Sequence, residues 1–186
     1  MSDVGERMLQ ELRRIREALE GQQPLGFGKK AQPVYVFVKH SPECLWYTRD
    51  KVEAQNVPIV ERDLTGYLRG VWRFDREDQS TQVSVPKLML LMHADRDYVI
   101  QSGLETQFSK SLLAGLLELP PEALSEPLTL IVEDNAGSKA RPTVFARLEW
   151  RGQRMTPAFN RSALVDELLA QVQAKFGLGS PFGAAE

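Results

Sequence analysis

The single cysteine of the chain, Cys44, lies among side chains that suit thiol chemistry. His40 and Lys39 fall within six residues of it, and a cationic imidazole or ammonium stabilises the thiolate, the nucleophilic form of cysteine. Glu43 is the adjacent residue, and its negative charge opposes thiolate formation. The stretch therefore permits a single thiol that exchanges with an external thiol, or a small buried cysteine with no chemical role.

A second group of side chains suits the binding of nucleic acid. Between Asn135 and Arg161, six basic residues accompany one acidic residue, and three aromatic residues are interleaved with them. Basic side chains contact phosphates, and aromatic rings stack on bases. The alternative is a solvated hairpin, because Phe145, Arg147 and Glu149 share one alternation and mix charges of both signs. The complete group is Lys139, Arg141, Arg147, Glu149, Arg151, Arg154 and Arg161, with Phe145, Trp150 and Phe159.

The composition is that of a globular protein with one main domain, since 186 residues with 42% hydrophobic and 26% charged side chains suit that class. A formal charge of -2 gives no bulk attraction to nucleic acid or membranes, so a local patch must bind any charged partner. Cys44, His40 and His93 are too few for a cysteine and histidine zinc site. The sequence also contains no phosphate-binding loop, dinucleotide fingerprint or nucleophile elbow.

The N-terminal segment predicts an amphipathic helix over residues 1–20, with apolar residues every three or four positions from Val4 to Leu19. Residues 21–33 are rich in glycine and proline and predict a flexible linker. The apolar stripe predicts packing on the main domain, or binding to a protein partner or a second copy of the chain. The charged start and the absence of about 18 consecutive apolar residues predict a cytoplasmic protein that spans no membrane.

Residues 34–119 predict alternating strands and helices. The run 34–39 is apolar and rich in β-branched residues, as in a buried strand. Ser41 as N-cap and Pro42 at the first helical position predict that a helix begins just before Cys44. The other elements expected here are a strand at 57–64, a helix at 65–78, a hairpin of strands at 83–92 and 98–102, and a helix at 103–119.

Residues 120–177 predict a small strand, strand and helix unit that follows this domain. The two strands are expected at 128–134 and 143–155, and the helix at about 160–176. The remaining residues, 178–186, are expected to form a flexible tail.

In its particulars, the order of elements over 34–119 resembles the glutaredoxin branch of the thioredoxin fold. The matching features are Lys39 just before the thiol turn, "VPIVERDLTG" as the second strand and its exit, "SVP" before the third strand, and a turn at Gly103. The resemblance implies an α/β fold with a thioredoxin-like, glutaredoxin-like mixed sheet and flanking helices. The N-terminal helix then precedes this domain, and the C-terminal β-β-α extension at 120–177 follows it.

The resemblance also assigns roles around Cys44. The tetrad "SPEC" matches the thiol turn of the family, with Ser41 at the nucleophile position and Cys44 at the resolving position, whereas an alternative alignment on "CLWY" makes Cys44 the nucleophile. Pro86 matches a proline whose peptide bond is cis in that family. Around glutathione or a substrate peptide the resemblance places Lys39, Val85, Pro86, Ser102, Gly103 and Glu105, and His40 completes the expected binding residues.

Three functions follow as expectations. A serine in place of the nucleophile implies a degenerate glutaredoxin-like protein, a redox-inactive module that binds a protein partner or a second copy through its N-terminal helix. One alternative is a glutathione-dependent oxidoreductase that uses the single thiol of Cys44, with glutathione as its cofactor. The other is a nucleic-acid-binding protein that uses the basic segment 135–161. No metal site is expected in any of them.

Overall fold

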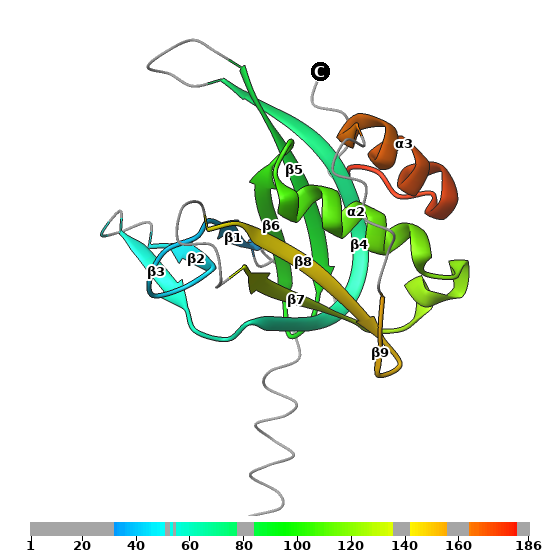
Figure 1. The fold of residues 1–186 in the computed structure, drawn as a ribbon, viewed down its shortest axis with the longest axis horizontal. Coiled ribbons are helices and arrows are strands. Elements are labelled where there is room, and N and C mark those ends of the chain that lie inside the picture. Colours follow the sequence, from blue (N-terminus) through cyan, green and yellow to red (C-terminus); the bar gives the residue numbers. More distant parts are fainter. Residues whose placement is uncertain are drawn as a thin grey trace, which may run out of the picture. The chain divides into compact units, whose positions relative to one another are not determined.

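One bent sheet of nine strands dominates the structure (Figure 1). The structure is a computed structural model, and it describes residues 32–50, 53, 55–77, 84–135, 142–155 and 164–181. The strands are β1 (Val34–Val38), β2 (Trp46–Arg49), β3 (Asn56–Ile59), β4 (Asp63–Glu77), β5 (Ser84–His93), β6 (Asp97–Gly103), β7 (Leu128–Asp134), β8 (Val144–Trp150) and β9 (Gln153–Arg154). The helices are α2 (Gln107–Glu118), the 3-10 helix η1 (Pro121–Ser125) and α3 (Val165–Phe176).

The strands lie in the order β3-β2-β1-β6-β5-β4-β7-β8-β9. β1 is parallel to β6, and the other neighbouring strands are antiparallel. The sheet is therefore mixed, with one parallel pair near its middle. In the part of the chain that the structure describes, no helix is long and apolar enough to cross a membrane.

β4 connects the two halves of the sheet. Its first residues, Asp63–Gly66, pair with β7, and the remainder pairs with β5. The register shifts between Leu68 and Gly70, and a bulge of this kind bends a strand. In Figure 1, β4 is one long curved ribbon that turns from β7 toward β5. Gly66 suits this course because a Cβ atom there would lie 2.7 Å from the carbonyl oxygen of His93.

The inner side of the bent sheet holds the hydrophobic core. Alternate residues of β5 and β7 point into it, as the two-residue period of a strand requires. Apolar side chains of α2 join the same cluster, so both halves of the sheet share one core. Burial of each large side chain stabilises the fold by about 1.5–3 kcal/mol. The largest fully buried side chains are Val71, Leu88, Leu90, Met92, Ile100, Phe108, Leu112, Leu113, Leu116, Leu119, Leu128 and Leu130.

α2 is held against β8 by polar as well as apolar contacts. Thr106 caps the helix by accepting a hydrogen bond from the backbone N–H of Ser109. One turn later, the Ser111 hydroxyl accepts a hydrogen bond of 2.9 Å from the backbone N–H of Ala146 in β8. These contacts fix the β7–β8 half of the sheet over the helix that follows β6.

The predicted thioredoxin-like α/β fold is wrong. The structure has strand β2 where the sequence predicts a helix beginning at Ser41, and strand β4 where it predicts a helix at 65–78. Ser41 and Pro42 favour the first two positions of a β-turn as much as a helix start. In β4, aromatic and β-branched residues favour a strand because β5 and β7 supply partners on the same sheet.

The predicted C-terminal extension is not separate from the rest of the fold. β7 and β8 continue the sheet beyond β4, and their apolar residues belong to the common core. α3 adds to this connection, because the Gln173 side chain donates a hydrogen bond of 2.9 Å to the carbonyl oxygen of Val71 in β4. Residues 120–177 are therefore part of the one sheet rather than an appendage to it.

Other elements agree with the sequence. The hairpin predicted at 83–102 is present as β5 and β6, and the helix predicted at 103–119 is present as α2. The helix predicted at 1–20 and residues 21–31 of the linker predicted at 21–33 lie outside the described residues.

Candidate functional site

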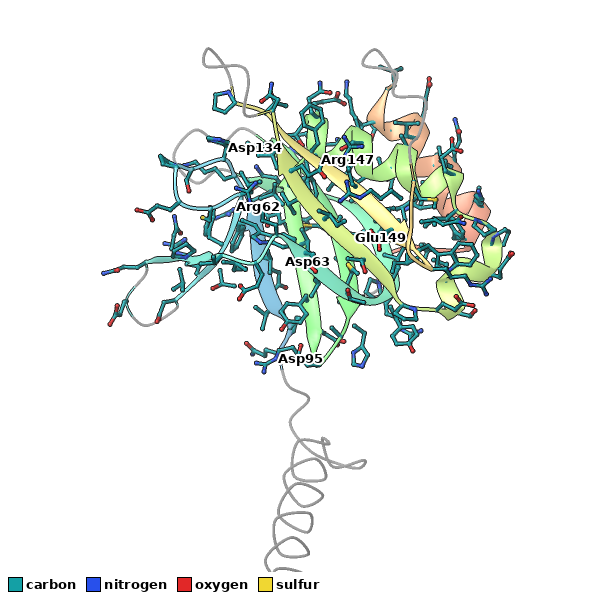
Figure 2. All side chains as sticks on the ribbon, turned by 60° about the horizontal axis from the view of Figure 1, so that its bottom comes forward. Arg62, Asp63, Asp95, Asp134, Arg147 and Glu149 are labelled. Carbon is teal, nitrogen blue, oxygen red and sulfur yellow. The ribbon has the colours of Figure 1, made fainter. Side chains whose placement is uncertain are left out.

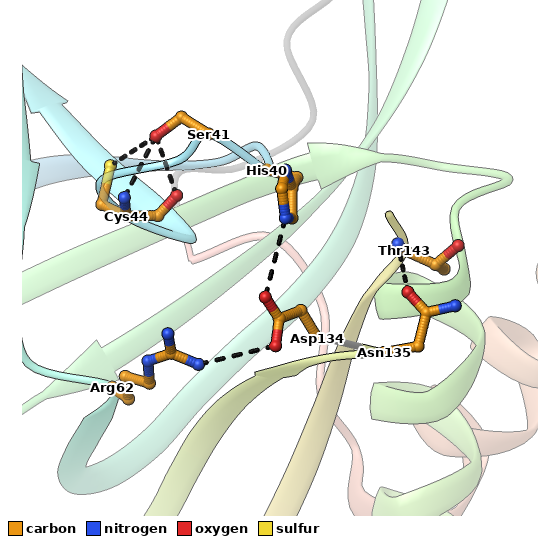
Figure 3. Close-up of polar contacts among 7 residues, drawn as sticks. All are labelled: His40, Ser41, Cys44, Arg62, Asp134, Asn135 and Thr143. Carbon is orange, nitrogen blue, oxygen red and sulfur yellow. Dashed lines mark hydrogen bonds and ion pairs between the residues drawn. The ribbon is translucent and has the colours of Figure 1, made fainter. Parts of the chain in front are cut away.

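Cys44 lies in the turn between β1 and β2 (Figure 3). Its backbone N–H donates a hydrogen bond of 3.1 Å to the Ser41 hydroxyl, and its carbonyl oxygen accepts one of 3.0 Å from the same hydroxyl. The Sγ atom of Cys44 lies 3.3 Å from the Ser41 Oγ atom. The two residues expected at the nucleophile and resolving positions therefore close a turn, and strand β2 rather than the predicted helix follows Cys44.

His40 contacts a carboxylate rather than the thiol. Its Nε2 atom lies 3.6 Å from Oδ2 of Asp134, whose Oδ1 lies 3.7 Å from an Arg62 nitrogen (Figure 3). This network joins the end of β1 to the end of β7 and to the segment before β4. The arrangement gives His40 a structural partner away from Cys44.

Some of the residues expected around glutathione do come together. Lys39, His40 and Ser102 line a cavity of about 230 Å³ at the start of α2. Gln107 also lines it, and the buried Oε1 atom of Gln107 has no hydrogen-bond partner in the described part of the chain. Cys44 is not among the lining residues, so the cavity offers no thiol to a bound molecule.

The remaining expected residues occupy ordinary positions at the ends of β5 and β6. No described residue has a cis peptide bond, so the cis bond expected at Pro86 is wrong. Pro86 lies opposite Asp75 of β4, and its carbonyl oxygen accepts a hydrogen bond of 3.1 Å from the backbone N–H of Leu104. Pro86 therefore lies in a regular antiparallel ladder, unlike the proline of the glutaredoxin family that it was expected to match.

Val85, Gly103 and Glu105 do not converge with Lys39 on one ligand position. Val85 is the ladder residue before Pro86, and Gly103 pairs with Lys87 of β5. Glu105 forms an ion pair of 3.4 Å with Lys110 in the first turns of α2. Of the residues expected around glutathione, only Lys39, His40 and Ser102 therefore line the same cavity.

The basic residues of segment 135–161 that the structure describes are paired with acidic residues. On the hairpin of β7 and β8, Arg147 forms an ion pair with Glu133, and Arg154 contacts Glu133 at 3.6 Å and Glu149 at 3.9 Å. Figure 2 shows Arg147 and Glu149 along β8. The described part of the hairpin therefore has the mixed charges of the solvated alternative. The predicted residues Lys139, Arg141, Phe159 and Arg161 lie outside the described residues.

At the end of the same hairpin, the positive charge of Arg151 is also paired with a carboxylate. Arg151 forms an ion pair with Glu126 and lies over the Trp150 ring, 4.4 Å from its centroid. The Trp150 indole N–H donates a hydrogen bond of 3.1 Å to Glu126. The carboxylate of Glu126, whose pKa is lowered chiefly by its hydrogen bond with Arg151, holds both side chains in place.

A different surface carries aromatic and basic side chains. Side chains alternate between the faces of a sheet. On β4, Val71 is fully buried in the core, so Trp72 points to the opposite side, as does Met89, its partner on β5. We call this side the outer face. Its residues are Tyr35 and Phe37 of β1, Tyr47 and Arg49 of β2, Gly70, Trp72, Phe74 and Arg76 of β4, Val85, Lys87, Met89 and Leu91 of β5, and Val99 and Gln101 of β6.

Aromatic rings on the outer face are open to solvent. Tyr35 is 43% exposed and Phe74 is 45% exposed. Phe37 and Tyr47 stack on each other with ring centroids 5.4 Å apart. Exposed rings thus occur on β4 and on β1, on either side of β5 and β6. Between them lie Met89, Leu91 and Val99, which are buried. A Cβ atom at Gly70 would lie 2.9 Å from the Gly179 carbonyl oxygen, so C-terminal residues cover part of the outer face.

Positive charge accompanies these rings. Arg49 and Arg76 are exposed and Lys87 is half-buried, and no ion pair joins any of them to an acidic residue that the structure describes. Asp97 points to the same side at the turn end of β6, where it contacts His93 at 2.7 Å, and Asp50 follows Arg49 at the end of β2. The outer face is therefore locally basic although the chain carries a net charge of -2.

A groove of about 610 Å³ runs along β1 and β2 beside the exposed rings. Tyr35, Phe37 and Arg49 line it. Asp50 also lines it, and the Asp50 Oδ1 atom accepts a hydrogen bond of 3.1 Å from the backbone N–H of Glu53. A volume of this size lies within the range of ligand-binding clefts.

The outer face was not predicted from the sequence, although the sequence carries a signal for it. In "GVWRF", a buried Val71 is followed by an outward Trp72, which is the alternation of a strand. Because residues 65–78 were predicted to form a helix, this alternation was not recognised. On β1, Tyr35 was expected to be buried because the run 34–39 is apolar at nearly every position.

Known proteins give no further indication of function. No family model matches the chain, and no curated protein or solved structure resembles it at a significant level. In the described ranges, no group of three or more histidine, cysteine, aspartate or glutamate side chains could hold a metal ion. The interpretation of the outer face therefore depends on its geometry and chemistry.

Proposed function

We propose that this protein binds single-stranded nucleic acid on the outer face of its sheet. One observation carries the proposal: exposed Phe74 and half-buried Trp72 lie beside Arg76 and Lys87, with no acidic residue at the neighbouring outer-face positions of β4 and β5. Flat apolar rings next to unpaired cations are the surface that a strand of bases and phosphates requires.

The aromatic residues supply the contact with bases. A base stacked on an aromatic side chain contributes about 1–3 kcal/mol and needs no particular sequence, because every base has a π-face. Phe74 is 45% exposed, whereas large apolar side chains are more often buried. A bound base would cover it.

The basic residues supply the contact with phosphates. Arg76 lies beside Phe74 along the outer face of β4, and Lys87 is the cross-strand partner of Phe74 on β5. Asp75 and Glu77, the acidic residues of this part of the strand, point to the other side, where Asp75 contacts Arg73 at 3.0 Å. The alternation of β4 thus separates cations that can meet phosphates from carboxylates that would repel them.

The order of elements offers independent support, as an analogy between topologies. β4, β5, β6, α2, β7 and β8 follow the connectivity of an OB-fold, a partly open barrel that binds oligonucleotides on the face of its second and third strands. The corresponding strands here are β5 and β6, which form the middle of the outer face. β1 occupies the place beside β6.

A single strand fits this surface better than a duplex. In a duplex the bases are stacked on each other, and their faces are not accessible to Phe74 or Trp72. Single strands expose those faces, so stacking adds to the phosphate contacts. The basic residues alone would bind both forms, with an affinity that falls as salt increases.

The proposal is tested by fluorescence anisotropy with a labelled oligothymidylate of about 15 nucleotides and a duplex of the same length. The expected result is binding of the single strand at about 50 mM salt, weaker binding of the duplex, and weakening with added salt. Phe74→Ala should lower the affinity for the single strand about 5- to 100-fold, as expected for one lost stacking contact.

Phe145→Ala is the matched control, because Phe145 lies on β8 outside the outer face. It should leave the affinity unchanged, and thermal melts should show that both variants are folded. Absence of binding by the wild-type protein at low salt, or equal losses in the two variants, would contradict the proposal.

A further inference from the structure

We propose that the β1–β2 hairpin carries a second stacking platform, so that one nucleic-acid strand crosses the outer face from β4 to β2. The inference rests on the proposed function and adds to it a second site, of defined residues, on the same path. The platform consists of Tyr35, Phe37, Tyr47 and Arg49.

The strand register places this platform on the same side of the sheet as Trp72. Tyr35 pairs with Val99, and Phe37 pairs with Gln101, in the parallel ladder between β1 and β6. Val99 in turn pairs with Leu91 of β5, on the outer side. The rings of β1 therefore continue the surface that begins on β4.

The second platform also combines aromatic rings with a cation, although Asp50 lines its groove as well. The stacked pair of Phe37 and Tyr47 presents aromatic surface on two adjacent strands. Tyr35 is exposed and lines the groove of about 610 Å³ together with Arg49. The guanidinium of Arg49 has no ion-pair partner among the described acidic residues, so it is available to a phosphate.

The separation of the platforms suits a short strand. β1 and β4 are three strand positions apart in the order β1-β6-β5-β4, which corresponds to about 14 Å at a strand spacing of about 4.8 Å. A stacked single strand advances about 3.4 Å per nucleotide, so roughly four nucleotide steps cover the distance. Met89, Leu91 and Val99 between the platforms are buried, and Gly179 and Pro181 lie against Gly70 on the same side. The strand would therefore contact the rings and cations on either side of this covered middle rather than these residues.

The experiment measures affinity as a function of oligonucleotide length. Oligothymidylates of about 4 to 16 nucleotides are titrated into the full chain and into the double variant Tyr35→Ala, Arg49→Gln. Wild-type affinity should rise at least about tenfold once the oligonucleotide spans both platforms, as expected for one additional stacking contact with a phosphate contact. The double variant should lose most of that gain and bind the shortest oligonucleotide as wild type does.

Tyr35→Phe provides a control that keeps the ring, and it should retain the length-dependent gain. Thermal melts check that the double variant is folded, which is expected because both side chains are exposed. If wild type and double variant gain equally with length, or if the double variant loses equal affinity at every length, the second platform is wrong while the proposed function stands. If the wild-type chain binds no oligonucleotide, the proposed function itself fails.

Discussion

At the scale of single residues, the informative feature is the contrast between exposed and buried neighbours on the outer face. Tyr35 and Phe74 are exposed, whereas Val99 between them is fully buried. Large aromatic side chains normally gain stability by burial, so two rings left open on one face support the proposal that a partner binds there. Planar rings with few rotatable bonds also lose little conformational entropy when a base covers them.

Tryptophan fluorescence gives a direct report on this face. Trp46 is 2% exposed and Trp150 is engaged with Glu126, whereas Trp72 lies on the outer face. We expect an oligothymidylate to quench part of the fluorescence, because a stacked base alters the emission of the ring beside it. Trp72→Phe should remove this quenching while leaving binding by anisotropy within a fewfold of wild type. Quenching that persists in Trp72→Phe would show that the oligonucleotide lies elsewhere.

Cys44 is expected to have no part in binding. Its backbone and Sγ atom contact Ser41 within the turn, and the residue is not on the outer face. Cys44→Ala removes the sulfur but keeps the backbone hydrogen bond, so it should lower the free energy of unfolding by about 1 kcal/mol or less and leave the affinity unchanged. Urea denaturation and anisotropy measure the two effects, and a loss of affinity in a stable variant would contradict the assignment.

At the scale of elements, the strand alternation of β4 and β5 separates charges. Lys87→Gln removes a cation that faces the proposed phosphates, so the slope of log affinity against log salt should decrease by about 0.7 for a single strand. Arg154→Gln is the control, because Arg154 is already paired with Glu133 and Glu149. Equal salt slopes in wild type and Lys87→Gln would remove Lys87 from the interface.

The course of β4 depends on close backbone approach at Gly66. A Cβ atom at this position would lie 2.7 Å from the His93 carbonyl oxygen, so Gly66→Ala must displace backbone. We expect a loss of about 1–3 kcal/mol in the free energy of unfolding, measured by urea denaturation. Gly179→Ala serves as control, because its added Cβ has open space. A stability of Gly66→Ala equal to that of the control would show that β4 tolerates a side chain at this point.

The sequence predicted some elements and misassigned others for identifiable reasons. Helix α2 and the β5–β6 hairpin were predictable because leucine spacing and a polar turn are local signals. β2 and β4 were not, because "SPEC" suits a helix start and a turn equally, and β4 becomes a strand through partners distant in the chain. The outer face could not be predicted while β4 was taken for a helix. Its residues could be grouped only once the register of the strands was known.

At the scale of the whole molecule, one bent sheet serves two purposes. Its inner side holds the core that joins β4–β6 to β7–β8 through α2, and its outer face leaves rings and cations accessible. The chain carries a net charge of -2, so long-range attraction to a polyanion is weak and the contacts on the outer face must supply the affinity. Binding should therefore be local, and it should not involve the ion-paired hairpin of β7 and β8.

The most direct test of this account is a map of amide chemical shifts in the isotope-labelled full chain during titration with an oligothymidylate of about 15 nucleotides. We expect the shifts to concentrate on the outer-face strands, with large changes at Trp72, Phe74 and Lys87 and further changes at Tyr35. Arg147 and its neighbours on β8 should remain unchanged. Shifts centred on β7 and β8, or no shifts at a saturating concentration, would contradict the claim that the outer face binds single-stranded nucleic acid.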